Sequence, residues 1–191
     1  MTAAREGIST EPIMNKAMEG MAKQIKEQNI ISAMEAVYGR HTYANQLAKS
    51  LSNDPKSIET MTQTIADGLT AGMKAQNMEP VVAHLKARTL QQTKNKAENN
   101  NLAIQTMQTL RTMARLGIKA SVVSDILCEA LQSQYTHLEM NQLLQHLSQQ
   151  AHLISPQQIV NQHAKSIGKA GNASGVGASS GGGNGGGGPG P

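Results

Sequence analysis

Two short segments of this chain, GMKAQN at Gly72 and GIKASV at Gly117, share one pattern: a glycine, an apolar residue, a lysine and an alanine. A glycine just beyond a helix can adopt the left-handed conformation that closes the helix, and the apolar residue after it folds back on the last turn. Three further segments fit a similar pattern: GISTEP at Gly7, QIKEQN at Gln24 and QYTHLE at Gln134. The sequence therefore predicts five helix-closing turns and a chain of helices joined by short connections.

Between these turns apolar residues recur every three or four positions, which indicates helices with one buried face. We expect helices that begin at Thr10, run from Ile30 to Leu51, continue from Asp54 to Gly72, start near Asn77, run from Leu102 to Gly117, and span Val122 to Ser133, Leu138 to Leu153 and Pro156 to about Ile167. Asp54 and Ser155 should cap the helices that follow them. The first helix should bury a stripe formed by Met14, Met18, Met21 and Ile25.

The composition also favours helices. The 191 residues include 11 Met and three Tyr but neither Phe nor Trp, so the core must be aliphatic. Sheets favour aromatic and β-branched residues, whereas Met fills irregular gaps between helices. From Gly168 onward Gly and Ser dominate and almost nothing can be buried. We predict an all-α array or bundle of about eight helices in residues 1–167, followed by a disordered Gly/Ser-rich tail in residues 168–191.

Related segments recur at two offsets along the chain. An offset of 110 residues aligns Ala4, Arg5, Gly7 and Ile8 with Ala114, Arg115, Gly117 and Ile118. An offset of 48 residues aligns EGMAKQIKEQN at Glu19 with DGLTAGMKAQN at Asp67. We interpret these matches as a degenerate repeat of helical hairpins that each bury a face against the next.

The first helical segment also carries a resemblance. STEPIMNKAMEGMAKQI, residues 9–25, contains an EPxxNKAxEGxAK helix, and a long polar helix and a Gly-rich C-terminal run follow it. In these features the chain resembles uncharacterised bacterial proteins that carry a secretion signal and repeated helical hairpins. The likeness covers about the first fifty residues well and the rest by pattern. It implies an extracytoplasmic location and no particular activity.

The densest basic stretch of the chain contains Lys86, Arg88, Lys94 and Lys96. Gln, Asn and Thr dilute these cations, and no aromatic residues accompany them for base stacking. The stretch therefore fits a solvated helix face better than a phosphate-binding stripe. The polar segment from Lys86 to Asn101 either continues the fourth helix into water or frays before Asn99, and it is a candidate partner-binding surface.

The second candidate surface is YGRHTY, residues 38–43, in the middle of the second helix. Tyr38, Arg40, His41 and Tyr43 could form a patch that binds an anion or a partner carboxylate, because arginine offers a fork of donors. In the alternative interpretation Tyr38 packs inward, Gly39 admits a neighbouring helix, and the other side chains face water.

No residue pattern predicts catalysis, a metal site or a cofactor. None of the histidines in the last third is spaced three or four residues from another, as a helical metal site requires. Cys128 lies among apolar residues, which favours a buried side chain over a nucleophile. Glu19 and Glu129, at equivalent repeat positions, are the only candidate carboxylates, and solvated pairs with lysine are the simpler interpretation. We therefore expect no enzyme.

The function that we expect is a helical binding or structural module that recognises a protein partner through helix faces. The alternative is a basic cytoplasmic module that binds nucleic acid or an acidic protein, because the net charge is +4. No apolar run approaches the length of a membrane span. The first residues, MTAAREGIST, lack the apolar core of a signal peptide, so a cytoplasmic protein and a mature secreted protein both remain open.

Overall fold

The computed structural model describes residues 9–91, 95–150 and 153–166. Within these ranges the chain forms eight α-helices and no strand, which confirms the all-α prediction. The helices are α1 (Glu11–Ala22), α2 (Glu27–Leu51), α3 (Pro55–Thr70), α4 (Ala75–Gln91), α5 (Lys96–Arg115), α6 (Ala120–Gln132), α7 (His137–Gln150) and α8 (Pro156–Ser166). The predicted tail, residues 168–191, lies outside the described residues.

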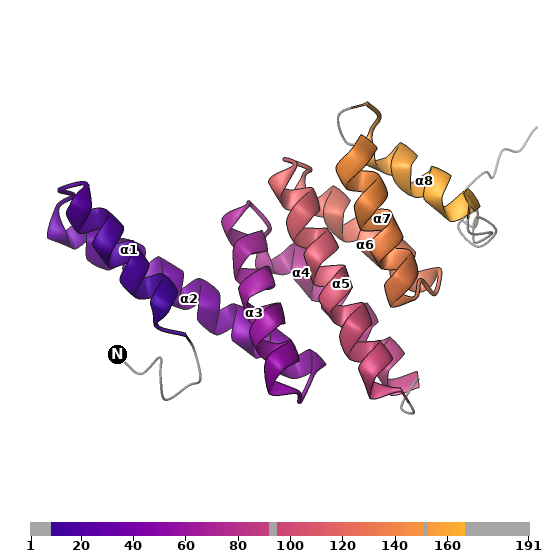
Figure 1. Cartoon of the computed structure of the whole chain (residues 1–191), viewed down its shortest axis with the longest axis horizontal. Coiled ribbons are helices and arrows are strands. Elements are labelled where there is room, and N and C mark those ends of the chain that lie inside the picture. Colours follow the sequence, from indigo (N-terminus) through magenta and orange to yellow (C-terminus); the bar gives the residue numbers. More distant parts are fainter. Residues whose placement is uncertain (1–8, 92–94, 151–152, 167–191) are drawn as a thin grey trace, which may run out of the picture.

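The helices are arranged in two layers with a projecting hairpin (Figure 1). α3, α5 and α7 pack side by side in one layer, and α4 and α6 pack against each other in the second. α2 packs on α3 at one end, and α8 packs on α7 at the other. α1 packs on the first half of α2, and this hairpin extends beyond the other helices. We call residues 9–40 the arm and residues 41–166 the array.

Four of the five predicted closing turns lie in the described residues, and all four are confirmed. Backbone φ is positive at Gln24 (53°), Gly72 (108°), Gly117 (76°) and Gln134 (60°). In each turn the next residue donates its N–H to the carbonyl five positions earlier, and the closing residue donates to the carbonyl three positions earlier. This pair of bonds defines a Schellman motif. The fifth predicted turn, at Gly7, lies outside the described residues.

The predicted caps are also confirmed. The Asp54 carboxylate accepts the backbone N–H of Ser57 at 2.8 Å and so begins α3. Ser155 and Gln158 form a reciprocal capping box, in which the Gln158 side chain accepts the Ser155 N–H at 3.0 Å and the Ser155 hydroxyl accepts the Gln158 N–H at 3.4 Å. Short polar signals therefore fix both helix starts.

One continuous aliphatic core fills the array. It includes six methionines: Met61, Met73, Met78, Met107, Met113 and Met140. Gly68 lets α3 approach α5 closely, because a Cβ at this position would lie 2.9 Å from Cδ2 of Leu110. Whether the hairpins descend from one repeated unit stays a prediction. Within the described ranges, none of the helices combines the length and the hydropathy needed to cross a membrane.

The prediction that α1 buries its methionine stripe is wrong. Met14, Met18, Met21 and Ile25 are all exposed. The face that packs on α2 lies one residue earlier, at Ile13, Ala17 and Gly20, and only Ile13 of these is fully buried. The two backbones approach closely, since a Cβ on Gly20 would lie 2.6 Å from Ile30. Small residues therefore decide which face of α1 meets α2, and the larger methionines remain outside.

The polar segment from Lys86 to Asn101 agrees only in part with the second predicted alternative, because the fourth helix ends before Asn99 but residues 96–101 are helical. α4 ends at Gln91 and α5 already begins at Lys96. The side chain of Asn95 accepts the N–H of Glu98 at 3.1 Å and caps α5. Asn99 is buried within α5, so this helix starts earlier than its apolar residues indicate. The first turns of α5 consist mostly of polar residues, so apolar periodicity does not reveal them.

Candidate functional site

A groove of about 1190 Å³ lies where the arm joins the array. Three helices form it. The start of α1 contributes Glu11, Pro12 and Asn15, the middle of α2 contributes His41, Asn45 and Lys49, and α3 contributes Pro55, Ile58, Glu59, Thr60, Thr62 and Gln63. Ser9, just before α1, completes the described lining.

The α2 side of the groove follows from helical spacing. His41, Asn45 and Lys49 lie four residues apart, so they line one face of the helix. His41 and Asn45 are buried, and the Asn45 amide donates to the Thr62 hydroxyl at 3.5 Å. Burial lowers the pKa of His41, the nearby Arg40 lowers it further, and Asp67 opposes the shift. The lowered pKa favours the neutral imidazole, which offers one donor and one acceptor.

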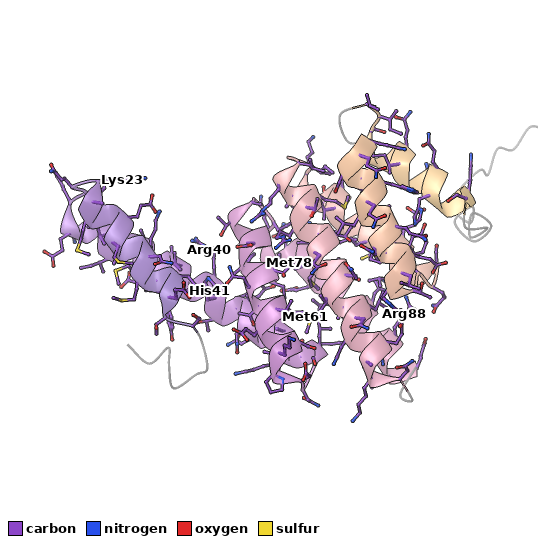
Figure 2. The ribbon with its side chains drawn as sticks, in the orientation of Figure 1. Lys23, Arg40, His41, Met61, Met78 and Arg88 are labelled. Atoms are coloured by element: carbon purple, nitrogen blue, oxygen red, sulfur yellow. The ribbon has the colours of Figure 1, made fainter. Side chains whose placement is uncertain are left out.

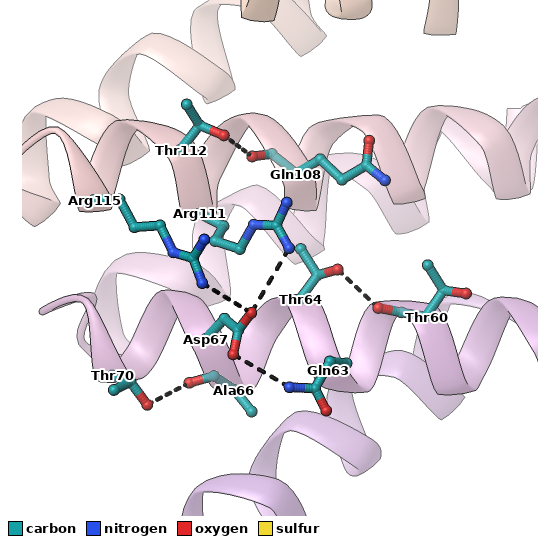
Figure 3. Close-up of polar contacts among 10 residues, drawn as sticks. All are labelled: Thr60, Gln63, Thr64, Ala66, Asp67, Thr70, Gln108, Arg111, Thr112 and Arg115. Carbon is teal, nitrogen blue, oxygen red and sulfur yellow. Dashed lines mark hydrogen bonds and ion pairs between the residues drawn. The ribbon is translucent and has the colours of Figure 1, made fainter. Parts of the chain in front are cut away.

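On the α3 side of the groove, Asp67 links the lining residue Gln63 to two arginines of α5. Asp67 accepts a bond from the Gln63 amide at 3.2 Å, and Gln63 lines the groove. The guanidinium groups of Arg115 and Arg111 form ion pairs with the same carboxylate at 3.2 Å and 3.7 Å (Figure 3). Because two cations hold Asp67, it can orient Gln63 and leave the amide oxygen of that side chain available.

Most of the side chains that line the groove carry a polar group, and their charges nearly cancel. Its uncharged hydrogen-bonding side chains are Ser9, Asn15, Asn45, Thr60, Thr62 and Gln63. Its charged side chains are Glu11, Glu59 and Lys49, and the lowered pKa of His41 favours its neutral form. Such a lining suits a polar, uncharged peptide segment better than an anion, because it carries two carboxylates and one ammonium group.

The predicted YGRHTY patch does not stay together in the structure. His41 lines the groove, whereas Tyr38 packs against the small core of Ile13 and Val37 in the arm. Tyr43 packs against the array core and donates its hydroxyl to the carbonyl of Ala75 at 3.3 Å. Burial raises the pKa of Tyr43.

Arg40 and Gly39 of the same segment lie in different surroundings. Arg40 is half-exposed, and Figure 2 shows it beside His41 where α2 nears α3. The expectation that Gly39 admits a neighbouring helix is wrong, because no atom lies within 4 Å of a Cβ built there. Successive residues of a helix point in different directions, so the side chains of YGRHTY lie on different faces of α2 although they are adjacent in the sequence.

The basic stretch is interrupted as well. Arg88 is 7% exposed, so the expectation that it lies on a solvated face is wrong. Its guanidinium donates to the backbone carbonyl of Tyr135, which follows α6. Burial lowers the pKa of Arg88, while Glu98 and Glu139 oppose the shift. Lys86 and Lys96 are exposed, and Lys94 lies outside the described residues.

Other candidates from the sequence lie away from the groove. Glu19 is exposed and pairs with Lys16 and Lys23, which hold its pKa at about 2. Glu129 is half-buried in α6. Cys128 is also half-buried, and burial raises the pKa of its thiol. None of these residues lines the groove.

Sequence spacing missed a histidine pair that tertiary packing creates. The rings of His146 in α7 and His163 in α8 meet edge to face at 5.0 Å, and His163 also meets Tyr135 at 5.4 Å. In the part of the chain that the structure describes, no group of three metal-ligating side chains gathers. The pair therefore contributes packing at the end of the array.

Comparison with known proteins gives no significant match, whether to family models, to curated sequences or to solved structures. The geometry of the groove and of the arm is therefore the basis for any functional inference.

Proposed function

We propose that the chain is a non-enzymatic module that binds an extended segment of a protein partner in the groove between α1, α2 and α3. The observation that carries the proposal is the lining itself: amide and hydroxyl side chains from three helices face one open groove. An extracytoplasmic location, implied by the resemblance, belongs to the proposal and rests on the sequence alone.

The chemistry of the lining supports a peptide rather than a small molecule. Each Asn or Gln amide offers donors and an acceptor that match the N–H and C=O groups of an extended peptide. Pockets for small molecules have smaller volumes, on the order of 300–1,000 Å³. Ile58 and Pro12 supply apolar contacts for side chains of such a segment. The groove therefore suits backbone recognition with modest side-chain selectivity.

The charge distribution supports protein over nucleic acid. Phosphate binding requires several cations on one surface, and its affinity falls steeply with salt. The groove has one lysine and two glutamates, and burial of Arg88 takes one cation of the basic stretch away from the surface. These observations weigh against the alternative of a module for nucleic acid or acidic proteins.

A display library of random linear peptides tests the proposal. Peptides selected on the wild-type protein should bind Asn15→Ala and Gln63→Ala at least about 10-fold more weakly, because each variant removes a groove amide. Both side chains are exposed, so the fold should persist. The matched controls are Asn29→Ala and Gln76→Ala, exposed amides that do not line the groove.

Two results would contradict the proposal. One is selected peptides that bind the groove variants and the controls equally well. The other is tight binding of duplex or single-stranded DNA that weakens steeply with salt, which would favour the nucleic-acid alternative.

A further inference from the structure

The arm presents an apolar stripe that its own helices do not cover. The side chains of this arm stripe are exposed by 52% at Met14, 52% at Met18, 61% at Met21 and 45% at Ile25. The arm has little core of its own, because only Ile13 and Val37 are fully buried there. An exposed apolar stripe beside so small a core is typical of an interaction surface.

The spacing of the arm stripe matches a helix-pairing seam. Its members are separated by four, three and four residues, which is the alternation of the two core positions of a heptad. Met14, Met18 and Met21 lie on α1, and Ile25 extends the stripe in the closing turn. The stripe lies about 100° around α1 from the face that packs on α2. α1 can therefore contact α2 and a further helix at the same time.

We propose that the arms of two copies of this chain pair antiparallel through this stripe and form a four-helix bundle. In an antiparallel seam each core position faces the other type of position, so Met18 faces Met21 of the second copy and Met14 faces its Ile25. The pairing is isologous, because the same surface serves both copies. Methionine side chains are flexible enough to interdigitate without a fixed shape.

The charges of the arm favour a second copy over an anionic surface. Residues 9–40 contain four basic and four acidic side chains. Two of the lysines, Lys16 and Lys23, already pair with Glu19 on the same helix. The residues flanking the seam, Asn15 and Ala22, carry no charge, so two copies meet without repulsion. A membrane-surface helix instead uses a strongly basic face with Trp or Phe, and this chain has neither aromatic residue.

The shape of the molecule permits this pairing. α1 starts beside the array and ends at the far tip of the arm, where Figure 2 shows Lys23. Antiparallel arms therefore place the two arrays at opposite ends of the bundle. Asn15 both lines the groove and flanks the seam, whereas Gln63 on α3 lines the groove only, so the Gln63→Ala variant tests peptide binding independently of dimerisation.

Sedimentation equilibrium of the full chain tests the proposal. The wild type should be a concentration-dependent dimer, and Met18→Glu should weaken association by at least about 10-fold, because the seam would bury an unpaired carboxylate. The control is Leu90→Glu, the same type of change at a residue that is 77% exposed on the array. Leu90→Glu should leave the dimer intact. A monomeric wild type, or a Met18→Glu dimer of wild-type affinity, would overturn the proposal.

A mixture of two variants tests the register. Met21→Lys alone should also be monomeric, but mixed with Met18→Glu it should form a heterodimer, because the introduced charges face each other across the seam. Two folded monomers that fail to associate would overturn the antiparallel pairing.

Vesicles of phosphatidylcholine and phosphatidylglycerol test whether a membrane surface covers the stripe in place of a second copy. If the wild-type monomer bound these vesicles and Met18→Glu did not, the proposed dimer would also be overturned.

Discussion

The array and the arm use the same residue types in different surroundings. The six methionines of the array core are at most 4% exposed, whereas Met14, Met18 and Met21 of the arm are at least 52% exposed. The arm methionines form a helical stripe among themselves, whereas an array methionine such as Met61 belongs to a stripe with other aliphatic residues, Ile58 and Ile65. Most of the array helices pack on two or more other helices, while α1 packs mainly on α2. Periodicity therefore predicts an apolar face, and the number of neighbouring helices decides whether that face is buried.

The largest expected effect contrasts one methionine from each region. Met107→Ala in the array should lower the free energy of unfolding by about 2–5 kcal/mol, because it leaves a cavity in a fully packed core. Met18→Ala in the arm should change it by about 0.5 kcal/mol or less in the monomer. Urea unfolding followed by circular dichroism measures both, under conditions where the chain is monomeric. Equal losses would mean that the arm stripe is covered within the chain.

An intermediate effect contrasts two arginines. Arg88→Ala should cost about 1–3 kcal/mol, because the buried carbonyl of Tyr135 loses its donor. Arg40→Ala, at a half-exposed position of the arm, should cost about 0.5 kcal/mol or less. The same urea titration applies to both variants. If Arg40→Ala proved the more costly change, the arm would be anchored to the array by that side chain and the division into two regions would fail.

The smallest effect contrasts two glycines and should differ in sign. Gly117→Ala in the array should lower stability by about 1 kcal/mol, because φ is 76° and an alanine is strained there. Gly39→Ala in α2 should raise it by about 0.5–1 kcal/mol, because alanine is the better helix former and has open space. Thermal unfolding detects both shifts. Destabilisation of similar size in both variants would refute the assignment of Gly117 as a helix-closing residue.

Much of the fold could be predicted because its signals are local. The closing residues Gln24, Gly72, Gly117 and Gln134 and the cap at Asp54 each depend on hydrogen bonds within a few residues, so short patterns suffice. The candidate site could not be predicted in the same way. Of the four residues singled out in YGRHTY, only His41 lines the groove, since its other walls come from α1 and α3.

Backbone capping and apolar periodicity depend on neighbours along the chain, so the sequence alone predicted the helices, several of their ends and an aliphatic core. Which apolar stripe is buried and which charge is desolvated depends on tertiary packing. Gly20 and Ala17 bring α2 onto one face of α1 and leave its methionines outside, and the turn before α7 brings a carbonyl to Arg88. Such outcomes depend on which surfaces meet across long sequence separations, and no local pattern contains that information.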